Sequence, residues 1–180
     1  MCIRDSYGSN NVSKINPSTG AKQDYPTGTG ASGPRGIAYD GTSVWVTNSG
    51  NGSLSKIDPS TGAKTDHFGG LSQPSGIAFD GTSLWVTNFN QTYVTKFNRA
   101  NDGTTNYITL TAPLGIAFDG TNIWVANNGT GIVSKLDSSV DGNRTDYFSS
   151  GNNPYGVVFD GTNIWVTTNS NDTAAKINPG

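Results

Sequence analysis

One stretch of the chain is repeated four times, and this repeat constrains the fold more than any other feature. The copy that begins at Pro113 reads P-L-G-I-A-F-D-G-T-N-I-W-V-A-N. Near-identical copies begin at Pro34, Pro74 and Pro154, so successive copies start 40, 39 and 41 residues apart. A fixed period of about 40 residues is typical of proteins built from repeated supersecondary units. The sequence therefore predicts a repeat protein.

Each copy predicts a β-hairpin. The segment G-I-A-F-D is rich in β-branched and aromatic residues, as strands are, and the second segment, I-W-V-A-N, has the same character. The Asp-Gly step between them is a strong hairpin signal, because glycine accepts the positive φ that such turns require. Both strands are apolar at nearly every position, so both of their faces must be covered by other parts of the protein.

A second repeated segment completes the unit. The run S-K-I-D-P-S-T-G-A-K at 55–64 resembles S-K-I-N-P-S-T-G-A-K at 13–22. It predicts a third strand, a Pro-Ser-Thr-Gly turn and a fourth strand. Four antiparallel strands in about 40 residues form the blade of a β-propeller. A parallel β-helix needs shorter rungs, and a helical solenoid needs a period of 3.6 residues that is not found here. The predicted fold is therefore an all-β propeller.

The repeat also divides the chain. The expected blades are, in order, 7–33 (partial), 34–73, 74–112, 113–153 and 154–180 (partial). The chain is expected to be a fragment cut at both ends, forming an open arc whose terminal blade faces are apolar and exposed. In an alternative arrangement, the strands within 154–168 complete the blade begun by 11–25 and close a four-bladed ring.

Residues 1–6, M-C-I-R-D-S, match no repeat and contain the only Met and the only Cys of the chain. The segment resembles a translated sequencing adapter, so we interpret it as a non-native addition. We expect it to be disordered or to make few contacts. Without it the chain has no cysteine, which excludes disulfides, thiol catalysis and cysteine-ligated metals.

The repeat resembles a known family. W-V-T-N within P-x-G-I-A-F-D-G-T-x-I-W-V-T-N, followed by V-S-K-I-D-P-S-T-G, resembles the YVTN-type propeller repeats, and it is similar to the NHL repeats and the streptogramin-lyase-like propellers. The resemblance covers 7–180 and implies the blade architecture. It leaves the function open, because these families contain binding scaffolds, lyases and lactonase relatives. In the lyase-like enzymes it implies a His and a Glu near a magnesium ion at the channel mouth. This chain has no Glu and a single His, so no catalytic residue can be transferred to it.

Three kinds of repeated residues could carry chemistry, and each has a structural alternative that we favour. One carboxylate per blade could form a ring that binds a metal, but each is the first residue of an Asp-Gly turn, where it can bond the backbone. The tryptophans could form a carbohydrate-binding platform, but they are expected to pack between blades. The lysines could form a stripe for an anionic ligand, but their stems are expected to cover apolar surface while the ammonium groups reach water. These residues are Asp40, Asp80, Asp119 and Asp160; Trp45, Trp85, Trp124 and Trp165; and Lys14, Lys56, Lys96, Lys135 and Lys176.

His67 is the only histidine and lies in a predicted outermost strand, where other copies have Tyr147 or polar residues. A general base would need a place in a cleft beside a carboxylate. We therefore expect His67 to be a rim residue. No catalytic residue, no metal site and no cofactor is predicted, and no phosphate-binding, zinc-protease or nucleophile-elbow motif occurs.

Composition narrows the possible partners. Charged residues make up 13% of the chain and the formal net charge is −2, so there is no basic patch for nucleic acid. No apolar run is long enough to span a membrane. A sequence with little charge and much Thr, Asn and Ser is typical of exported proteins, so we expect an extracellular or cell-envelope location.

Binding residues are expected where strand four connects to strand one and strand two to strand three, because both connections lie on one face of a propeller. On this face the repeats vary: the residue between Pro and Gly is Arg35, Ser75, Leu114 or Tyr155. This variation indicates either a surface adapted to one asymmetric ligand or unconstrained solvent-facing positions. Arg35, Phe89 and Tyr155 are the predicted ligand contacts, because arginine and aromatic side chains dominate binding energies.

The sequence thus favours a non-enzymatic binding or interaction scaffold. Its ligand is expected to be a protein, a glycan or a small molecule on the loop face, without nucleic acid or a membrane span. The alternative is a fragment of a lyase-like or hydrolase-like propeller enzyme whose catalytic residues lie in missing blades.

Overall fold

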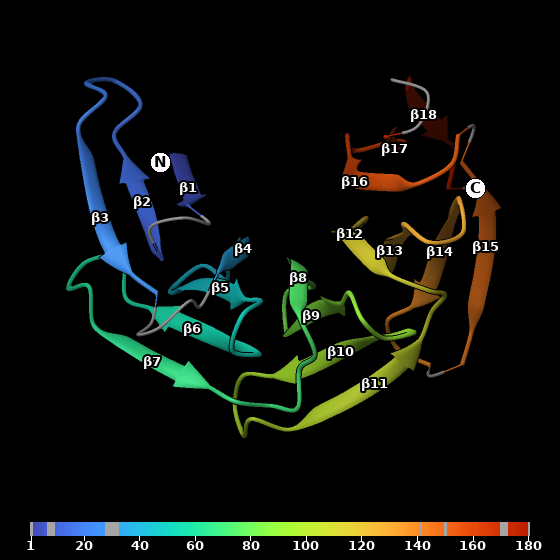
Figure 1. Cartoon of the computed structure of the whole chain (residues 1–180). Helices are drawn as coiled ribbons and strands as arrows, with labels where there is room; N and C mark the ends of the chain where they lie inside the picture. Colours follow the sequence, from blue (N-terminus) through green and yellow to red (C-terminus); the bar gives the residue numbers. More distant parts are fainter. Residues whose placement is uncertain are drawn as a thin grey trace.

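The structure is a computed structural model that describes residues 10–27, 33–140, 142–149, 151–169 and 173–179, together with the backbone of 2–6. In these residues all regular secondary structure is β-strand, arranged in five antiparallel sheets that follow one another around an arc (Figure 1). The fold is a β-propeller, as the repeat predicts.

Each sheet is a simple up-and-down meander in chain order. The sheets are β1 (Cys2–Ser6), β2 (Asn11–Ile15) and β3 (Lys22–Pro26); β4 (Pro34–Tyr39), β5 (Val44–Asn48), β6 (Ser53–Ile57) and β7 (Lys64–His67); β8 (Pro74–Phe79), β9 (Ser83–Asn88), β10 (Tyr93–Asn98) and β11 (Thr104–Ile108); β12 (Pro113–Phe118), β13 (Asn122–Asn127), β14 (Ile132–Asp137) and β15 (Arg144–Phe148); and β16 (Pro154–Phe159), β17 (Ile164–Thr168) and β18 (Thr173–Ile177). We call them blades 1 to 5.

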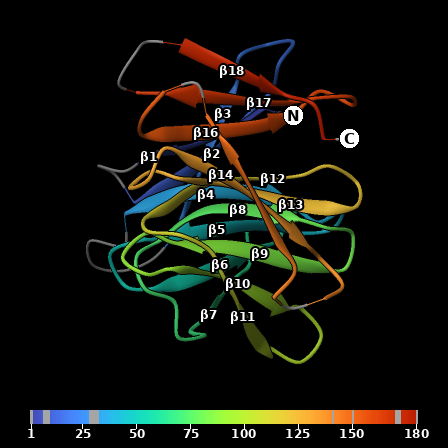
Figure 2. The same ribbon diagram turned by 90° about the vertical axis from the view of Figure 1, so that its right-hand side faces the viewer.

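The first strand of a blade lies nearest the centre and the fourth lies at the circumference. Figure 1 shows β4, β8, β12 and β16 around the centre, with β7, β11 and β15 outermost. Turned by 90°, the two sides of the arc overlap in the view, and the strands run across the molecule (Figure 2). This arrangement brings the starts of the four inner strands together on one face.

Three of the four tryptophans pack between blades as predicted, whereas Trp165 does not and is partly exposed. Trp85 of blade 3 and its neighbour Val94 form one cluster with Ile123, Val125 and Leu136 of blade 4. Equivalent clusters bury Trp45 and Trp124, and all three indoles are fully buried. This packing explains why strand two has apolar residues on both faces, because each blade covers one face of the next.

The last blade shows the exposed face that an open arc requires. Trp165, in β17, is 38% exposed, and its partner across the strands, Val158, is 58% exposed. The equivalent tryptophans of blades 2 to 4 are fully buried, and the residues equivalent to Val158 are half-buried. The prediction of an exposed apolar terminal face is therefore confirmed at this end.

The alternative of a closed four-bladed ring is wrong. β17 pairs with β16 and β18, and β2 pairs with β1 and β3, so the first and last sheets are separate. Figure 1 shows these two sheets on either side of the opening of the arc. Since both central strands already have two main-chain partners, neither has a free edge to join the other.

The prediction that residues 1–6 make few contacts is wrong for Cys2–Ser6. This segment pairs along its whole length with β2, and Ile3 lies opposite Lys14 as Trp45 lies opposite Lys56. Its backbone thus takes the place of a second strand. An unpaired strand edge accepts any extended segment through main-chain hydrogen bonds, whatever its side chains. Met1 and the side chain of Ile3 lie outside the described residues, and the non-native origin of residues 1–6 stays a prediction.

Candidate ligand-binding cavity

The starts of the four inner strands enclose an open cavity of about 640 Å³. Each strand contributes the x-Gly-Ile or x-Gly-Val part of its Pro-x-Gly segment to the wall, and β4 also contributes its proline. The lining residues are Pro34, Arg35, Gly36 and Ile37; Ser75, Gly76 and Ile77; Leu114, Gly115 and Ile116; and Tyr155, Gly156 and Val157. Its volume lies within the range of about 300–1,000 Å³ that is typical of small-molecule sites.

The glycines of these segments bring neighbouring inner strands into close backbone contact. A Cβ atom added to Gly36 would lie 2.2 Å from the carbonyl oxygen of Ser75, and one added to Gly76 would lie 2.4 Å from that of Leu114. At Gly115 the distance to the carbonyl oxygen of Tyr155 would be 2.2 Å. No side chain fits at these points, so the backbones pack directly and only the x residue can vary.

Threonine hydroxyls fasten the same segments to one another. Thr47 Oγ1 accepts a hydrogen bond from the Gly36 N–H at 2.7 Å and donates one to the Ser75 carbonyl of the next blade at 2.6 Å. Thr87 Oγ1 makes the equivalent pair of bonds, to the Gly76 N–H and the Leu114 carbonyl. The threonine of the W-V-T-N motif therefore holds the cavity wall in place at the interfaces between blades 2 and 3 and between blades 3 and 4.

The interface between blades 4 and 5 lacks this bridge, because Ala126 stands in place of threonine. Ala126 is fully buried, and it has no hydroxyl to join the Gly115 N–H to the Tyr155 carbonyl. The two blades are linked nearby by Asn128, whose Nδ2 donates to the Pro154 carbonyl at 3.2 Å.

We expect Ala126→Thr to raise the free energy of unfolding by about 1 kcal/mol, the usual net value of a hydrogen bond. The added hydroxyl would meet the same backbone geometry that Thr47 and Thr87 use. Urea unfolding followed by circular dichroism measures the change. Thr87→Ala is the matched control: it removes the equivalent hydroxyl from the interface between blades 3 and 4 and should lower the free energy of unfolding. A less stable Ala126→Thr variant would mean that this interface is packed too closely for the extra atoms.

The cavity unites two of the three predicted ligand contacts. Arg35 and Tyr155 line it from β4 and β16, and Tyr155 is 56% exposed. Phe89 lies outside the lining, half-buried in the β9–β10 connection, where its N–H donates to the Gln73 carbonyl. Ser75 and Leu114 also line the cavity. Their variation between repeats was visible in the sequence, but their small or aliphatic side chains did not mark them as contacts.

The four aspartates are occupied in the hairpin turns between the first and second strands of their blades. Asp119 Oδ1 accepts the backbone N–H groups of Thr121 and Asn122 at 2.8 and 2.6 Å, while its Oδ2 accepts the indole N–H of Trp124 at 2.6 Å. Asp40, Asp80 and Asp160 make the same three bonds in their blades. The turn role was predicted from sequence, but the bond to the tryptophan was missed. In every copy of the repeat, the aspartate lies five residues before the tryptophan, and this constant spacing could have indicated the bond.

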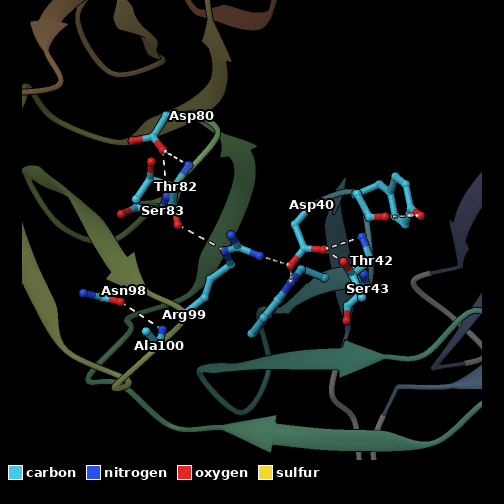
Figure 3. A network of polar contacts seen from close by, with 12 residues as sticks. Asp40, Thr42, Ser43, Asp80, Thr82, Ser83, Asn98, Arg99 and Ala100 are labelled. Carbon is cyan, nitrogen blue, oxygen red and sulfur yellow. Dashed lines mark hydrogen bonds and ion pairs between the residues drawn. The ribbon is translucent and has the colours of Figure 1, made fainter.

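Asp40 also binds across a blade interface. Arg99, in the β10–β11 turn, places Nη1 2.6 Å from Asp40 Oδ2 and donates from Nε to the Thr82 carbonyl (Figure 3). The guanidinium also lies 4.6 Å from the Phe79 ring centre. The side chain of Asp40 is only 2% exposed, so this pair ties blade 2 to blade 3 in a largely dry environment. Sequence reasoning missed this role of Arg99, which only this copy of the turn carries.

Three of these carboxyl groups, those of Asp40, Asp119 and Asp160, have lowered pKa values. Burial raises the pKa of Asp40, but the bonds from Ser43, Trp45, Thr42 and Arg99 outweigh it and lower the pKa to about 2, from an ordinary value of 3.8. At Asp160, the indole of Trp165 and the backbone N–H groups of the turn also lower the pKa to about 2.

Stability should therefore fall in acid. Because the folded pKa of Asp40 is depressed, its contribution is fully present above the unfolded value near pH 4 and is lost as the pH falls towards 2. Asp160 acts in the same window. We expect the melting temperature to be flat above about pH 4 and to drop between pH 4 and 2, as measured by calorimetry. Asp40→Asn should reduce this slope, and an unchanged slope would contradict the role given to Asp40.

His67 lies in the outermost strand of its blade as expected, but its side chain is largely buried rather than facing solvent at the rim. Its side chain is 16% exposed, and its ring packs 5.2 Å from Trp45 and 5.6 Å from Phe97, with Nδ1 3.1 Å from Asp102 Oδ1. His67 is the last residue of the fourth strand, β7, and its side chain points inward and lies against the tryptophan of the same blade, Trp45. Tyr107 and Tyr147 occupy the equivalent places over Trp85 and Trp124. His67 is therefore a packing residue, and it does not line the cavity.

The lysines of strand three are also structural. Lys56, Lys96, Lys135 and Lys176 lie with Nζ 5.0–5.8 Å from the tryptophan ring of their own blade, within cation–π range. Their stems cover apolar surface as predicted. The ammonium groups do more than reach water, however. Those of Lys14, Lys96 and Lys135 donate to backbone carbonyls in the outer turn of the next blade, at Pro59, Ser138 and Pro179. These contacts support a structural role for the lysines and give no support to an anion-binding stripe.

Neither a metal cluster nor a membrane span was found in the part of the chain that the structure describes. No group of three or more His, Cys, Asp or Glu side chains there could hold a metal ion. The same residues contain no helix that could cross a bilayer.

Four-stranded meander blades, inner strands around an axial cavity and tryptophans between the blades define the protein as a β-propeller. No family model and no curated protein sequence matches the chain. Among solved structures, it is similar to a streptogramin B lyase, with a TM-score of 0.80, 18% identity, and coverage of 100% of this chain and 68% of the lyase.

Two further structures resemble it. Virginiamycin B lyase from Staphylococcus aureus has a TM-score of 0.78 at 18% identity, and the match covers 99% of this chain and 69% of the lyase. BamB from Moraxella catarrhalis has a TM-score of 0.70 at 14% identity, and the match covers 94% of this chain and 53% of BamB. Identities this low establish the shared propeller fold alone. Membership of the YVTN or NHL families stays a prediction.

Proposed function

We propose that this protein is a non-enzymatic binding propeller that takes a small ligand in the cavity at the starts of its inner strands. One observation carries the proposal. Four equivalent positions on a nearly invariant backbone, Arg35, Ser75, Leu114 and Tyr155, meet in one cavity and differ in every blade. A rigid frame with varied side chains is the usual arrangement of a selective binding site.

The composition of the cavity wall supports binding rather than catalysis. Among its described lining residues there is no His, Asp, Glu, Cys or Lys. The wall therefore has no side chain whose ordinary pKa lies near neutrality and that could transfer a proton during a reaction. The remaining charged and aromatic groups, Arg35 and Tyr155, are types that dominate binding energies.

A fragment screen by ligand-observed NMR tests the proposal. Compounds that bind the protein should lose at least tenfold in affinity in Tyr155→Ala, which removes an exposed aromatic side chain from the cavity wall. They should bind normally to Thr121→Ala, an exposed position in a turn of the opposite face. Ligands that ignore Tyr155→Ala but weaken in variants of the opposite face would show that the wrong face was chosen.

A second candidate function is a lyase-like reaction, which the fold similarity to the two streptogramin-type lyases favours. In that case the catalytic groups would lie outside the described cavity wall. Incubation with virginiamycin B, followed by chromatography, tests this function directly. Turnover that survives Tyr155→Ala and Arg35→Gln would favour an enzyme whose site is elsewhere.

A further inference from the structure

A second hollow, of about 510 Å³, borders the turn between β2 and β3 in blade 1. Its described lining residues all belong to blade 1, and they include Ile15, Pro17 and Ala21. Figure 1 shows β2 and β3 at one end of the arc, where no described blade lies against the side of the sheet that faces away from blade 2. The hollow is separate from the axial cavity, with which it shares no lining residue.

The equivalent place in blade 2 is built from almost the same residues. The two turn segments, I-N-P-S-T-G-A-K and I-D-P-S-T-G-A-K, span 15–22 and 57–64. Ile15 and Ile57 have the same register in their hairpins, so they lie on the same face of their sheets. Ile57 is only 2% exposed, because residues of blade 1 cover it, whereas Ile15 is half-buried. A Cβ added to Gly20, in the turn of blade 1, would meet nothing within 4 Å.

In blade 2 this place receives an aromatic ring and an ammonium group from blade 1. The Tyr25 ring packs with Ile57 in one buried cluster, and a Cβ added to Gly62 would lie 3.1 Å from its Cε1 atom. Lys14 Nζ donates to the Pro59 carbonyl at 3.1 Å, and the Tyr25 hydroxyl lies 3.5 Å from the same oxygen. We call this place the socket. The hollow of blade 1 has the lining of the socket and is open to solvent.

The combination of ring and ammonium recurs further along the arc. At the interface between blades 3 and 4, Lys96 Nζ donates to the Ser138 carbonyl at 2.9 Å, and Tyr107 packs in one cluster with Leu136. These contacts repeat those of the socket in blade 2, although the turn of blade 4 has a different sequence. The repeats thus show which chemistry a socket takes: an aromatic ring against an aliphatic side chain, and an ammonium on a carbonyl of the outer turn.

We propose that the hollow of blade 1 binds a primary amine carried on a single aromatic ring, of the benzylamine type. The ring lies against Ile15 and Ala21, and the ammonium donates to the Pro17 carbonyl. One methylene between ring and nitrogen gives the reach, because in blade 2 the hydroxyl at the tip of the Tyr25 ring already lies 3.5 Å from the equivalent oxygen. These contacts come from β2 and the β2–β3 turn, and none of them involves a side chain of residues 2–6.

The lysines that line the hollow do not exclude a cation. Lys14 Nζ is engaged with blade 2, and Lys22 Nζ pairs with Asp24 at 3.0 Å. Blade 2 has the equivalent pair, Lys64 with Asp66, and its socket still accepts the ammonium of Lys14. The volume of the hollow lies in the range of about 300–1,000 Å³ that is typical of small-molecule sites.

Three probes test this inference: benzylamine, benzyl alcohol and n-butylamine. Their dissociation constants are measured by NMR titration of the full chain at pH 7, where both amines are cationic. We expect benzylamine to bind about three- to fivefold more tightly than benzyl alcohol, because a hydrogen bond from a charged donor is the stronger one. Butylamine should bind most weakly, since it lacks the ring. The amide signals that shift should be those of the β2–β3 turn.

Asn16→Asp tests the ammonium preference without disturbing the turn. Asp58 stands at this place in blade 2, and its Oδ1 accepts the Ser60 N–H at 2.8 Å as Asn16 Oδ1 accepts the Ser18 N–H at 2.9 Å. The variant adds a negative charge beside the Pro17 carbonyl. Benzylamine should therefore bind about two- to threefold more tightly, with the gain reduced by salt, while benzyl alcohol stays unchanged.

Ala21→Leu tests the position of the site. The larger side chain takes up space in the hollow, so every probe should lose at least about fivefold in affinity, while circular dichroism reports an unchanged fold. Val158→Ser, on the exposed face of the last blade, is the matched control and should leave every affinity unchanged.

Three results would overturn the inference. Equal binding of benzylamine and benzyl alcohol, unaffected by Asn16→Asp, would reject the ammonium preference. Normal binding to Ala21→Leu, or weakened binding to Val158→Ser, would place the probes outside the hollow. The absence of any binding at millimolar concentration would reject the site altogether. None of these results bears on ligand binding in the axial cavity, because the two sites share no residue.

Discussion

Trp85→Ala is expected to lower the free energy of unfolding by about 3–5 kcal/mol, the range for removing a large aromatic side chain from a core. Trp85 is fully buried between blades 3 and 4, where it packs with Val94, Ile123 and Val125. Its removal leaves a cavity that two sheets would have to close together. It also frees the carboxylate of Asp80, which loses the indole N–H that it accepts at 2.7 Å.

Trp165→Ala is the matched control for this prediction. Trp165 has the same place in the repeat and the same bond to an aspartate, but it is 38% exposed because no blade covers it. We expect its loss to cost less than half as much as that of Trp85. Urea unfolding monitored by far-UV circular dichroism measures the stability of both variants. Tryptophan fluorescence is unsuitable, because each variant lacks one of the tryptophans. Equal losses would mean that the indole stabilises its own hairpin rather than the blade interface.

Gly115→Ala is expected to cost about 3 kcal/mol or more, because the new methyl group would lie 2.2 Å from the carbonyl oxygen of Tyr155. That atom belongs to the backbone of the neighbouring inner strand, so the two blades must move apart. Gly115 has no positive φ. The cost therefore comes from the contact between blades and not from backbone strain, and thermal unfolding should report it directly.

Gly156→Ala provides the comparison at the same place in the repeat. There the nearest atom to an added Cβ is Thr167 Oγ1, at 3.1 Å, and this glycine also has no positive φ. We expect a change within about 1 kcal/mol, since a small adjustment of one side chain suffices and alanine restricts the unfolded chain. A Gly115→Ala variant as stable as Gly156→Ala would contradict the close packing of the inner strands.

The sequence by itself determined the architecture of this protein down to single strands. The repeat spacing and the Asp-Gly turns place the first two strands of blades 2 to 4 where they are found, and the Pro-Ser-Thr-Gly turn places the third and fourth strands of blade 2. Three of the four tryptophans lie between blades as expected, and Trp165 does not. These features are local: which residues form a strand, where it turns and which positions are apolar all follow from hydrogen bonding and burial within one repeat.

The tertiary structure alone decided what lies between repeats. Thr47 binds the Ser75 carbonyl 28 residues away, and Arg99 binds Asp40 across 59 residues. The pairing of Cys2–Ser6 with β2 and the burial of His67 were likewise missed, because both depend on which edge or face a neighbouring element leaves open.

The candidate site shows the same division. The variation at the residue between Pro and Gly was visible in the sequence, and it pointed to Arg35 and Tyr155. That these two meet with Ser75 and Leu114 in one cavity, while Phe89 lies outside it, depends on how closely the inner strands approach and how far the arc bends. Repeat periodicity records the fold of one blade, but the angle and distance between blades arise from side chains and carbonyls of different repeats in contact, so the sequence alone could not show them.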